Sequence, residues 1–448
     1  MVRSLVNALI VGAACLTSPA TAQDATGLRA QIDAMQAEIS RLSAQVAQLE
    51  AQQKPVATPV SIAAVTSPPV APPVTVAWKG GPEITGPGGF SFKPRGRMQL
   101  DAATVIAPGS LAVGNSLGLA TEFRRFYLGA EGTLPGGFGY RAEVDLANST
   151  VDLTDVYLTY KAGPKVTLTL GQHKPFWGLE ELTSDLFTSM RERAAFNSAF
   201  GFERRLGISG AYAGKSVLVQ LGAFTDNAAD LNADSNNSYS VDGRVVLSPK
   251  LGIGTLHIGG SAHFREFNDA ATTARYRARP FTHTTDVRLV DTKAFGATGE
   301  RSFGGELAYI GGPFHATLEG HRLTALRPGL ADPTFWGGYA EVGMVLTGET
   351  TAYKGGVYDR IKPSHPLDKG GLGAIQANAR YDMLDLGDGA INGGRQDVAA
   401  LSLIWMPTDY VRFLADYGHL WISRGAIPAG ASRDYQVDTF GVRGQFDF

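Results

Sequence analysis

The fold is decided by the last stretch of the chain, residues 437–448, which reads VDTFGVRGQFDF. Apolar and polar residues alternate along it, so that Phe440 and Phe446 share one face while Arg443 and Asp447 share the other. Successive side chains of a β-strand point to opposite faces, so the stretch predicts a strand with one apolar and one polar face. Lipid outside and water inside a transmembrane barrel impose that pattern. We therefore expect an antiparallel transmembrane β-barrel.

The overall composition favours a barrel over a bundle of membrane-spanning helices. Charged residues make up 18% and hydrophobic residues 44% of the chain, yet its mean hydropathy is only −0.04. No run of about 18 apolar residues follows the N-terminal stretch, which excludes a spanning helix beyond it. In alternating strands the lumen-facing residues offset the lipid-facing ones, which explains a mean near zero. The formal net charge of −2 gives no reason to expect a nucleic-acid partner.

The N-terminus has the pattern of a secretory signal peptide spanning residues 1–22. Arg3 precedes an apolar core at residues 5–14, and Ala20-Thr21-Ala22 supplies a cleavage site of small residues. The only cysteine, Cys15, lies inside this segment. Lipidation of Cys15 is the alternative, but the residues before it suit that processing poorly. We expect a mature chain without cysteine, and therefore without disulfide or thiol chemistry.

Residues 23–53 carry an apolar seam with alternating spacings of four and three. Its members are Leu28, Ile32, Met35, Ile39, Leu42, Val46 and Leu49. This heptad spacing predicts a short periplasmic coiled coil, the alternative being an amphipathic helix packed on the barrel. β-Branched residues at one seam position with Leu or Met at the other favour two strands.

Residues 54–89 are dense in proline. The prolines are Pro55, Pro59, Pro68, Pro69, Pro72, Pro73, Pro82 and Pro87. Because proline removes a hydrogen-bond donor and fixes its backbone angle, this density predicts an extended, semi-rigid linker with neither helix nor sheet.

Alternating segments recur from residue 90 to residue 448, which we expect to form a barrel of 16 strands, an even number in the usual range. The predicted strands are residues 90–102, 121–133, 137–147, 151–162, 165–173, 202–213, 216–225, 239–248, 254–266, 302–310, 314–325, 334–347, 373–385, 395–406, 410–421 and 435–448. Short Gly- or Pro-containing turns alternate with longer polar connections, which is typical of bacterial outer-membrane barrels. With both termini periplasmic, every short turn falls on the periplasmic side. Residues 348–372 are long for that side, and residues 281–291 are assigned to a long loop.

Residues 174–201 are too long for a simple connection and have an apolar rhythm. Such a loop either covers the mouth of the barrel or folds into the lumen. We expect insertion, because a 16-stranded barrel without an inserted loop leaves a wide, unselective channel. Lys174, Arg191 and Arg193 would then be the charges nearest the constriction. The alternative is that they pair with acids of the same segment, such as Glu180 and Glu192, and leave little net field.

The charged residues of the predicted strands share one face, which we assign to the lumen because a charge at the lipid midplane costs about 2–4 kcal/mol. Bases and acids on that face nearly cancel, so most of them are expected to pair across strands. Anion selectivity therefore requires a local cluster. Arg125 and Arg205 open two strands near the outer mouth and are candidates for such a cluster, and Arg141 on the lumen face is a further candidate.

The sequence offers no signal for catalysis or for a cofactor. His257 with His263, and His315 with His321, share a strand face by even spacing, and no cluster of Cys and His supports a metal site. No nucleophile elbow, phosphate-binding loop or zincin motif is present. We expect no enzyme activity, no metal and no cofactor.

Several short motifs match a known family as a set. They are Glu122-Phe123-Arg124-Arg125 with Tyr127, Gly139-Tyr140-Arg141 with Glu143 and Asp145, Asp155-Val156-Tyr157-Leu158, Gly171-Gln172-His173-Lys174-Pro175-Phe176-Trp177-Gly178-Leu179-Glu180, Met190-Arg191-Glu192-Arg193, Arg204-Arg205-Leu206-Gly207, Leu346-Thr347-Gly348-Glu349, Arg380-Tyr381 with Leu384, and the terminal Phe448. With these motifs, most of residues 90–448 resembles the phosphate-selective porin O and P family.

That resemblance implies a trimeric 16-stranded barrel whose third loop narrows the pore, with arginine and lysine residues that pass anions inward. By motif, Lys174, Arg191, Arg193 and Arg205 would take that role. The chain departs from the family pattern in two respects, because it lacks a dense run of lumen arginines and its third loop carries acids beside its bases.

We therefore expect an outer-membrane porin: a homotrimer in lipid that passively conducts small hydrophilic solutes, with anions such as phosphate favoured. The trimer takes precedence over the two-stranded preference of the coiled coil because the barrel interface is larger. The alternative is a structural envelope tether whose coiled coil binds a periplasmic partner. A barrel enzyme would need a nucleophile and a base at one rim, and the sequence supplies neither.

Overall fold

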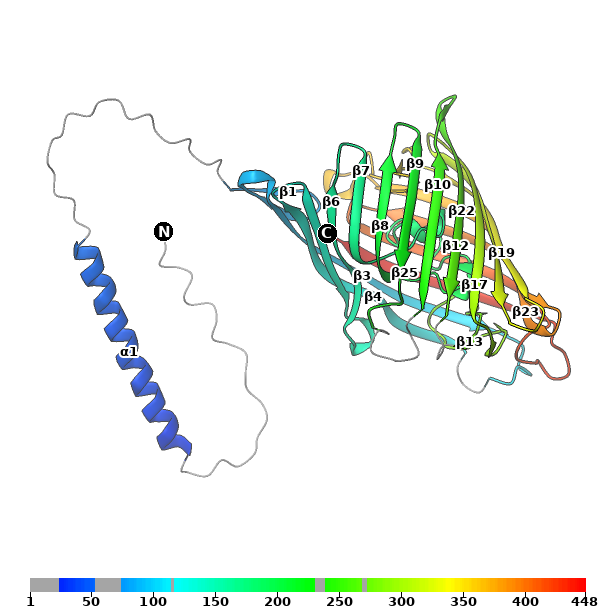
Figure 1. Cartoon of the computed structure of the whole chain (residues 1–448), viewed down its shortest axis with the longest axis horizontal. Helices are drawn as coiled ribbons and strands as arrows, with labels where there is room; N and C mark the ends of the chain where they lie inside the picture. The colour runs from blue at the N-terminus through cyan, green and yellow to red at the C-terminus, as the bar shows by residue number, and fades with distance from the viewer. Residues whose placement is uncertain (1–23, 53–73, 114–116, 230–237, 268–271) are drawn as a thin grey trace. The chain divides into compact units, whose positions relative to one another are not determined.

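The alternating segments of the sequence form a closed barrel. In the computed structural model, 16 antiparallel strands pair in chain order, and the last, β25 (Tyr435–Asp447), closes the ring on the first, β3 (Ser91–Ile106) (Figure 1). The other barrel strands are β4 (Leu119–Leu134), β5 (Phe138–Asp145), β6 (Asp152–Lys161), β7 (Val166–His173), β8 (Arg205–Ala213), β9 (Val217–Phe224), β10 (Tyr239–Leu247), β12 (Gly254–Glu266), β17 (Gly299–Gly311), β18 (Phe314–Leu326), β19 (Thr334–Val345), β22 (Ala374–Asp388), β23 (Ile391–Met406) and β24 (Val411–Ser423). The prediction of an all-β barrel with this strand number is confirmed.

The structure describes residues 24–52, 74–113, 117–229, 238–267 and 272–448. The predicted signal peptide, residues 1–22, lies outside them. Residues 1–70 and 71–448 form separate units, and α1 (Asp24–Gln52) is the element described in the first. The predicted helix is therefore present, whereas its assembly into a coiled coil stays a prediction. No helix in the described ranges is both long and apolar enough to cross a membrane.

The second half of the proline-rich segment contains sheet, contrary to the prediction of an extended linker without sheet. Residues 75–85 form an antiparallel hairpin of β1 (Thr75–Trp78) and β2 (Pro82–Thr85), which is followed by η1 (Pro87–Gly89). β2 pairs with the start of β3, so this hairpin extends the barrel sheet. The expectation of no sheet fails here because Pro82 occupies the first position of its strand, where the missing donor is tolerated. Residues 53–73 of the predicted linker lie outside the described residues.

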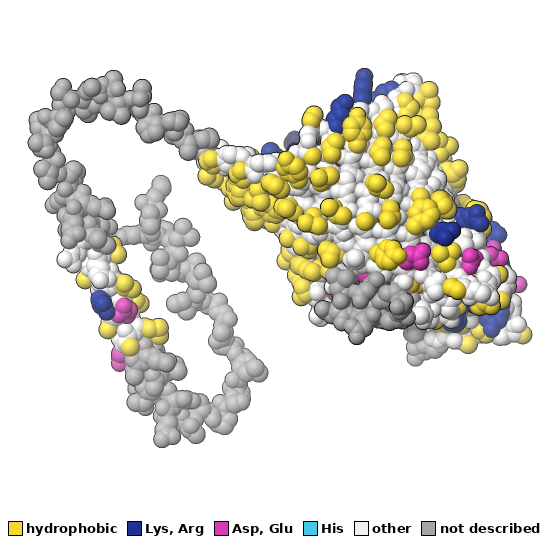
Figure 2. All heavy atoms as spheres, viewed as in Figure 1, with side chains coloured by type: hydrophobic (Ala, Val, Ile, Leu, Met, Phe, Trp, Pro, Cys, Tyr) yellow, Lys and Arg dark blue, Asp and Glu magenta, His cyan; other side chains and the backbone are white. Residues whose placement is uncertain are grey.

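Side chains alternate between the outside and the lumen along each barrel strand. In β25, Phe440, Val442 and Phe446 are exposed on the outer wall, whereas Arg443 and Asp447 are buried on the inner side. Figure 2 shows apolar side chains spread over the outer wall. The face assignment made from the sequence of this strand is confirmed.

The two ends of the barrel differ in the length of their connections. Short connections at residues 135–137, 162–165, 214–216, 248–253, 312–313 and 407–410 lie at one end, which we call the turn end (upper end in Figure 1). β11 (Lys250–Leu251) lies in one of these turns. The opposite end, which we call the loop end, carries most of the long connections; η2 (Ala147–Ser149) lies in a shorter one.

Three long connections shape the interior. The first, the inner loop (residues 174–204), contains α2 (Leu179–Leu182) and α3 (Ala195–Ala199). The second, the mouth loop (residues 267–298), carries the short pairs β13 (Thr273–Ala274) with β16 (Phe295–Gly296) and β14 (Arg277–Ala278) with β15 (Val290–Asp291). The third, the turn-end loop (residues 346–373), holds the hairpin of β20 (Tyr353–Lys354) and β21 (Val357–Tyr358) and then η3 (Leu367–Lys369). Residues 281–291 lie in the mouth loop, as predicted.

Candidate functional site

The inner loop is fixed to one wall of the lumen by hydrogen bonds. The backbone N and Nε of Arg191 donate to the carboxylate of Asp416 on β24 at 3.0 and 2.7 Å. The backbone N of Ala195 donates to Asp382 on β22 at 2.8 Å. Ser189 Oγ donates to Glu341 on β19 at 2.6 Å. These partners all face inward, so the predicted insertion of this loop into the lumen is confirmed.

Aromatic side chains of the inner loop fill part of the lumen against the same wall. Trp177 stacks on Phe202 with ring centroids 4.3 Å apart, and the ring of Phe196 lies 5.0 Å from that of His321 on β18. Phe196 belongs to a buried apolar cluster that also includes Phe335 on β19 and Leu384 on β22. Because this side of the barrel is filled, open space is left along the opposite wall, β3 to β7.

Two cavities follow that opposite wall. The loop-side cavity, toward the loop end, has a volume of about 490 Å³, and the turn-side cavity has a volume of about 970 Å³. Three residues line both cavities: Lys174, Asp185 and Arg204. We call these three the junction. They stand where the two cavities adjoin.

Two of the three junction residues are cations. Lys174 Nζ donates to Glu181 Oε1 at 2.7 Å. Burial, together with the nearby Arg193 and Arg204 guanidinium groups, lowers the pKa of Lys174 to about 8, against the opposing effect of Glu181. Arg204 donates to both carboxylate oxygens of Asp155 at 2.8 and 3.2 Å.

Asp185, the acid of the junction, is neutralised by two arginines of the strand wall. Asp185 accepts from Arg97 Nη1 at 2.5 Å and lies 2.6 Å from Arg125 Nε. Although burial opposes it, these two arginines hold the pKa of Asp185 well below its usual range. A carboxylate held between two guanidinium groups adds little negative field, so the junction presents a positive one.

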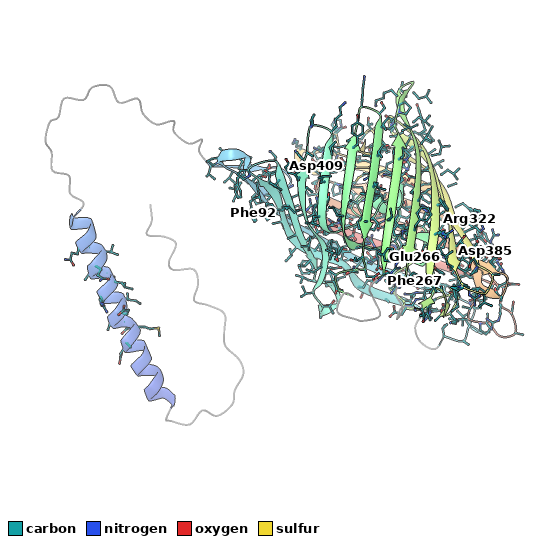
Figure 3. All side chains as sticks on the ribbon, in the orientation of Figure 1. Phe92, Glu266, Phe267, Arg322, Asp385 and Asp409 are labelled. Atoms are coloured by element: carbon teal, nitrogen blue, oxygen red, sulfur yellow. The ribbon has the colours of Figure 1, made fainter. Side chains whose placement is uncertain are left out.

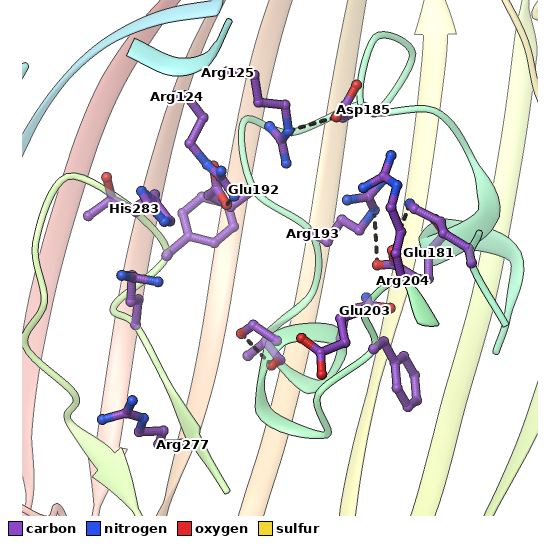
Figure 4. Close-up of a pocket in the computed structure, with 18 of the residues that line it drawn as sticks. Arg124, Arg125, Glu181, Asp185, Glu192, Arg193, Glu203, Arg204, Arg277 and His283 are labelled. Atoms are coloured by element: carbon purple, nitrogen blue, oxygen red, sulfur yellow. Dashed lines mark hydrogen bonds and ion pairs between the residues drawn. The ribbon is translucent and has the colours of Figure 1, made fainter. Parts of the chain in front are cut away.

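The loop-side cavity has more bases than acids. Eight lysine and arginine side chains line it against five aspartates and glutamates. Figure 4 shows Arg124 directed at Glu192 and Arg125 directed at Asp185, while Arg277 and His283 approach from the mouth loop. No ion pair engages Arg277 within the described part of the chain.

Two further cations, Arg279 and Arg288, belong to the mouth loop. Arg279 donates to Asp286 at 2.8 Å, and Arg288 donates to the backbone O of Asp286 at 2.7 Å. Burial and the neighbouring Arg279 and Arg277 lower the pKa of Arg288 to about 10. The Asp286 carboxylate also lies 4.0 Å from Arg288 Nη1, so one acid faces two guanidinium groups and an excess of positive charge stays at the rim of the cavity.

The turn-side cavity also has an excess of bases. Ten lysine and arginine side chains line it against seven aspartates and glutamates and the terminal residue Phe448. Arg141 pairs with Glu131 at 2.6 Å, and Arg360 pairs with Asp447. Among the described residues, no ion pair engages Lys93, Lys354 or Lys362. These lysines therefore add to the positive field at the turn end.

The turn-end loop enters the lumen and meets the inner loop. Tyr353 Oη hydrogen-bonds with Nδ1 of His257 at 2.6 Å, and the backbone O of Gly356 accepts from Arg244 at 2.9 Å. The backbone N of Tyr358 donates to Thr183 Oγ1 on the inner loop at 3.2 Å. Residues 348–372, which are long for a periplasmic turn, therefore fold into the barrel. There they narrow the space beside the turn-side cavity.

Four of the six candidate pore residues lie on the cavity walls. Lys174, Arg125 and Arg193 line the loop-side cavity, and Arg141 lines the turn-side cavity. Arg193 donates to the backbone O of Glu180 at 3.0 Å and to that of Thr183 at 2.8 Å, which holds the folded inner loop together.

Arg191 and Arg205 are placed differently from the expectation. Neither lines these two cavities, and their exposed fractions are 2% and 1%. Arg191 of the inner loop is bound by Asp416 on the strand wall. Arg205 Cζ lies 5.5 Å from the ring centroid of Trp177, which is itself buried. Any part of these two residues in anion passage stays a prediction.

Several cavity residues were not among the candidates. Arg204 lies inside the predicted strand 202–213, where alternation with the lumen candidate Arg205 would turn it outward, but β8 begins only at Arg205. Arg277, Lys354 and Lys362 lie in long loops whose paths into the lumen carry no periodic signal. The sequence signal that these loops carry is their content of basic residues.

The paired histidines are part of the wall network. His257 Nε2 lies 2.9 Å from Glu306, His263 Nδ1 lies 2.6 Å from Asp242, and His315 Nε2 lies 3.1 Å from Glu341. Each of these three imidazoles contacts an acid on a neighbouring strand, whereas His321 Nε2 lies 3.5 Å from Glu319 on its own strand. All four side chains are buried on the inner side, as the even spacing predicted.

Comparison with known proteins extends over the whole barrel. The sequence profile of the phosphate-selective porin O and P family matches residues 92–448. An uncharacterized protein of Caulobacter vibrioides is 40% identical over 477 residues, covering 99% of this chain and 96% of that one. Porin O of Pseudomonas aeruginosa is 27% identical over 335 residues, covering 67% of this chain and 74% of its own.

A solved structure supports the fold. The high-pH structure of Pseudomonas putida OprB superposes with a TM-score of 0.51 at 11% identity, covering 80% of this chain and 94% of that chain. At that identity the likeness concerns the barrel architecture alone. The profile match spans more than half of the chain, which confirms the resemblance seen in its motifs. The chain therefore belongs to the phosphate-selective porin O and P family of outer-membrane barrels.

Proposed function

We propose that this porin is a passive channel for small hydrophilic anions, with phosphate within the range of its solutes. The observation that carries the proposal is the junction, where the cations Lys174 and Arg204 line both cavities. Both cavities have more bases than acids, so the potential along this path favours an anion at each step. The name of the Pseudomonas aeruginosa relative, Porin O, and that of the family agree with this assignment.

The pairing of most cations suits conduction rather than tight capture. A channel must attract its ion strongly enough to admit it and weakly enough to release it. Arg204 pairs with Asp155, and Lys174 pairs with Glu181. Each acid offsets part of the electrostatic attraction that its cation exerts on a passing anion. The Lys93, Lys354 and Lys362 ammonium groups then provide further sites toward the turn end.

We further propose that the turn end and both termini face the periplasm and that the barrel is a homotrimer. Short turns on the periplasmic side are the usual arrangement in bacterial outer-membrane barrels. A trimer is what membership of this family implies. With that orientation the loop-side cavity opens to the outside of the cell and the turn-side cavity opens to the periplasm.

Planar-bilayer recordings of the purified protein test the anion proposal. Under a salt gradient the reversal potential is expected to show anion preference. Removing both junction cations in Lys174→Gln/Arg204→Gln should reduce that preference and lower the phosphate conductance. The matched control Lys165→Gln/Lys215→Gln removes two exposed cations from the turn-end rim and should behave as wild type. Cation preference in the wild type would contradict the proposal.

A second candidate function is an envelope tether built on α1. Its seam residues Met35, Ile39, Leu42 and Val46 are 59%, 63%, 52% and 54% exposed, which leaves an apolar stripe for a partner. Deleting residues 24–73 removes α1 and spares the hairpin that pairs with β3. A channel should keep its conductance after this deletion, whereas a tether should lose its envelope phenotype while conduction continues.

A further inference from the structure

Charged side chains on the outer wall are confined to one half of the barrel's circumference. The outward positions of β3 to β10 carry none within the described strands. Those of β12 to β25 carry Glu266, Arg301, Arg322, Asp385, Arg395, Asp397, His419 and Asp438. A charge on the lipid face is costly at the midplane and nearly free at the interface, so the height of these residues decides what they do.

Several of these residues form one continuous row across neighbouring strands. Arg322 on β18 pairs in register with Trp336 on β19, Trp336 with Asp385 on β22, and Asp385 with Arg395 on β23. Arg301 on β17 stands diagonally next to Arg322, because it faces Thr324 two residues further along. We call Arg301, Arg322, Trp336, Asp385 and Arg395 the outer row.

The outer row lies near the loop end. Each of its residues is within five residues of the loop end of its strand. Figure 3 shows Arg322 and Asp385 displaced along the barrel from Phe92 and Asp409 at the turn end. Toward the turn end the outward residues become apolar, with Leu307, Leu318 and Val342 exposed by 46%, 56% and 49%.

Two tryptophans lie equally close to the loop end of the outer wall. Trp336 in the row and Trp421 on β24 are each two residues from the loop end of their strand, and their exposed fractions are 51% and 38%. Trp and Tyr gather where the hydrocarbon meets the lipid headgroups. The outer row therefore stands at the boundary where the apolar wall ends and the headgroups begin.

Two arginines of the outer row are available for a ligand. Arg395 makes a bidentate pair with Asp397 at 2.7 and 2.8 Å, and Asp385 accepts from Arg424 at 2.7 Å. No ion pair engages Arg301 or Arg322 in the parts of the chain that the structure describes, and both are exposed. Arg322 lies over the face of Trp336 with Cζ 5.4 Å from the ring centroid, which orients its guanidinium group.

We propose that the outer row binds phosphorylated lipid headgroups of the outer leaflet, with Arg301 and Arg322 contacting phosphate oxygens. Guanidinium groups suit phosphate because their planar donors match its oxygens. A band at one height across several strands fits a leaflet surface, whereas a second barrel would contact the wall along its length. Assignment to the outer leaflet rests on the orientation given under the proposed function.

Native mass spectrometry of the detergent-solubilised protein tests this site. The probes are bisphosphorylated lipid A and the same lipid with its phosphates removed. Wild type should retain the phosphorylated form preferentially. Arg301→Gln/Arg322→Gln should retain it roughly thirtyfold less well, as expected for two basic residues lost at an anionic lipid surface. Arg301→Lys/Arg322→Lys should keep a large part of the binding.

The controls separate this inference from the channel function. Lys165→Gln/Lys215→Gln removes two exposed cations at the turn end and should retain lipid as wild type does. Single-channel conductance should be unchanged in all these variants, because the outer row does not line the cavities. Equal retention by wild type and the Arg301→Gln/Arg322→Gln variant would overturn the site. So would an equal loss in the control, indifference to the phosphates, or a change in oligomeric mass without a change in bound lipid.

Protease access on intact cells tests the orientation separately. If the loop end faces outward, cleavage sites engineered into the mouth loop should be cut. Protection of those sites would move the outer row to the inner leaflet and overturn the leaflet assignment, while anion conduction in bilayers would be unaffected.

Discussion

The guanidinium group of Arg191 occupies the space above Gly441, where an added Cβ would lie 2.1 Å from Arg191 Cζ. The same group is held by Asp416 at 2.7 Å and lies 3.8 Å from Asp101. Because Gly441 has no side chain, it leaves room for Arg191 of the inner loop to lie against β25. This contact is one of those that hold the inner loop against its wall and leave the opposite side of the lumen open.

Gly441→Ala should displace Arg191 and loosen the inner loop. Overpacking a closely fitted site typically costs about 1–3 kcal/mol, so the temperature at which the folded barrel band is lost in heat-modifiability gels should fall. Conductance should rise and become noisier, since the loop then moves within the lumen. Gly444→Ala on the same strand is the matched control, because its added Cβ meets only Phe413 ring atoms at 3.8 and 4.0 Å. Equal stability of the two variants would contradict this account.

Anion preference should depend on pH through Lys174. Burial lowers the pKa of this lysine to about 8, so it is a cation below that pH and neutral above it. The anion-to-cation permeability ratio should therefore fall as the pH rises through about 8. Reversal potentials measured across that range check the prediction.

Lys174→Arg supplies the control for the pH dependence. Arginine stays protonated throughout this range, so the step near pH 8 should disappear while anion preference remains. A step that persists in this variant would assign the titration to another group.

The barrel could be predicted from the sequence because its signal is local. Each strand meets lipid on one side and water on the other, so alternation appears in every segment without knowledge of its partners. The hairpin of β1 and β2 was missed because prolines on both sides obscured it, although Pro82 occupies a permitted strand position.

The candidate site was predicted less completely because its contacts are not local. Arg191 is buried by Asp416, which lies 225 residues further along the chain, so no nearby pattern shows that it faces away from the cavities. Arg204 falls within the predicted strand 202–213, whose two-residue period would turn it outward, but it lies in the inner loop before β8 and reaches the junction from there. The entry of the turn-end loop into the lumen depends on partners such as Thr183 and Arg244 in other loops and strands.

Arg360 should control the position of the turn-end loop. Its guanidinium group pairs with Asp447 and the backbone O of Asp409, and it lies 5.1 Å from the ring centroid of Phe187 on the inner loop. Arg360→Gln removes the charge from this network, where a charged hydrogen bond contributes about 1.5–3 kcal/mol. Single-channel recordings should show more frequent changes of conductance level. Lys369→Gln, an exposed change in the same loop, should leave the recordings unchanged, and identical traces from the two variants would contradict the prediction.

Neighbouring residues Arg204 and Arg205 should differ in their effects on conduction. Arg204 lines the junction, whereas Arg205 is buried beside Trp177 and its three side-chain nitrogens lack hydrogen-bond partners within the described residues. Arg204→Met should reduce the anion-to-cation permeability ratio about fivefold, the effect of about 1 kcal/mol of lost attraction.

Arg205→Met should leave the permeability ratio unchanged and should not lower thermal stability, because replacing a buried, poorly paired charge with an apolar side chain of similar length is often neutral or stabilising. The lost contact with the Trp177 ring contributes about 0.5–2 kcal/mol in the opposite direction, which the removal of burial cost offsets. Reversal potentials and unfolding temperatures of the two variants, measured side by side, decide between a pore role and a buried role. A selectivity loss in Arg205→Met as large as that in Arg204→Met would place Arg205 in the conduction path after all.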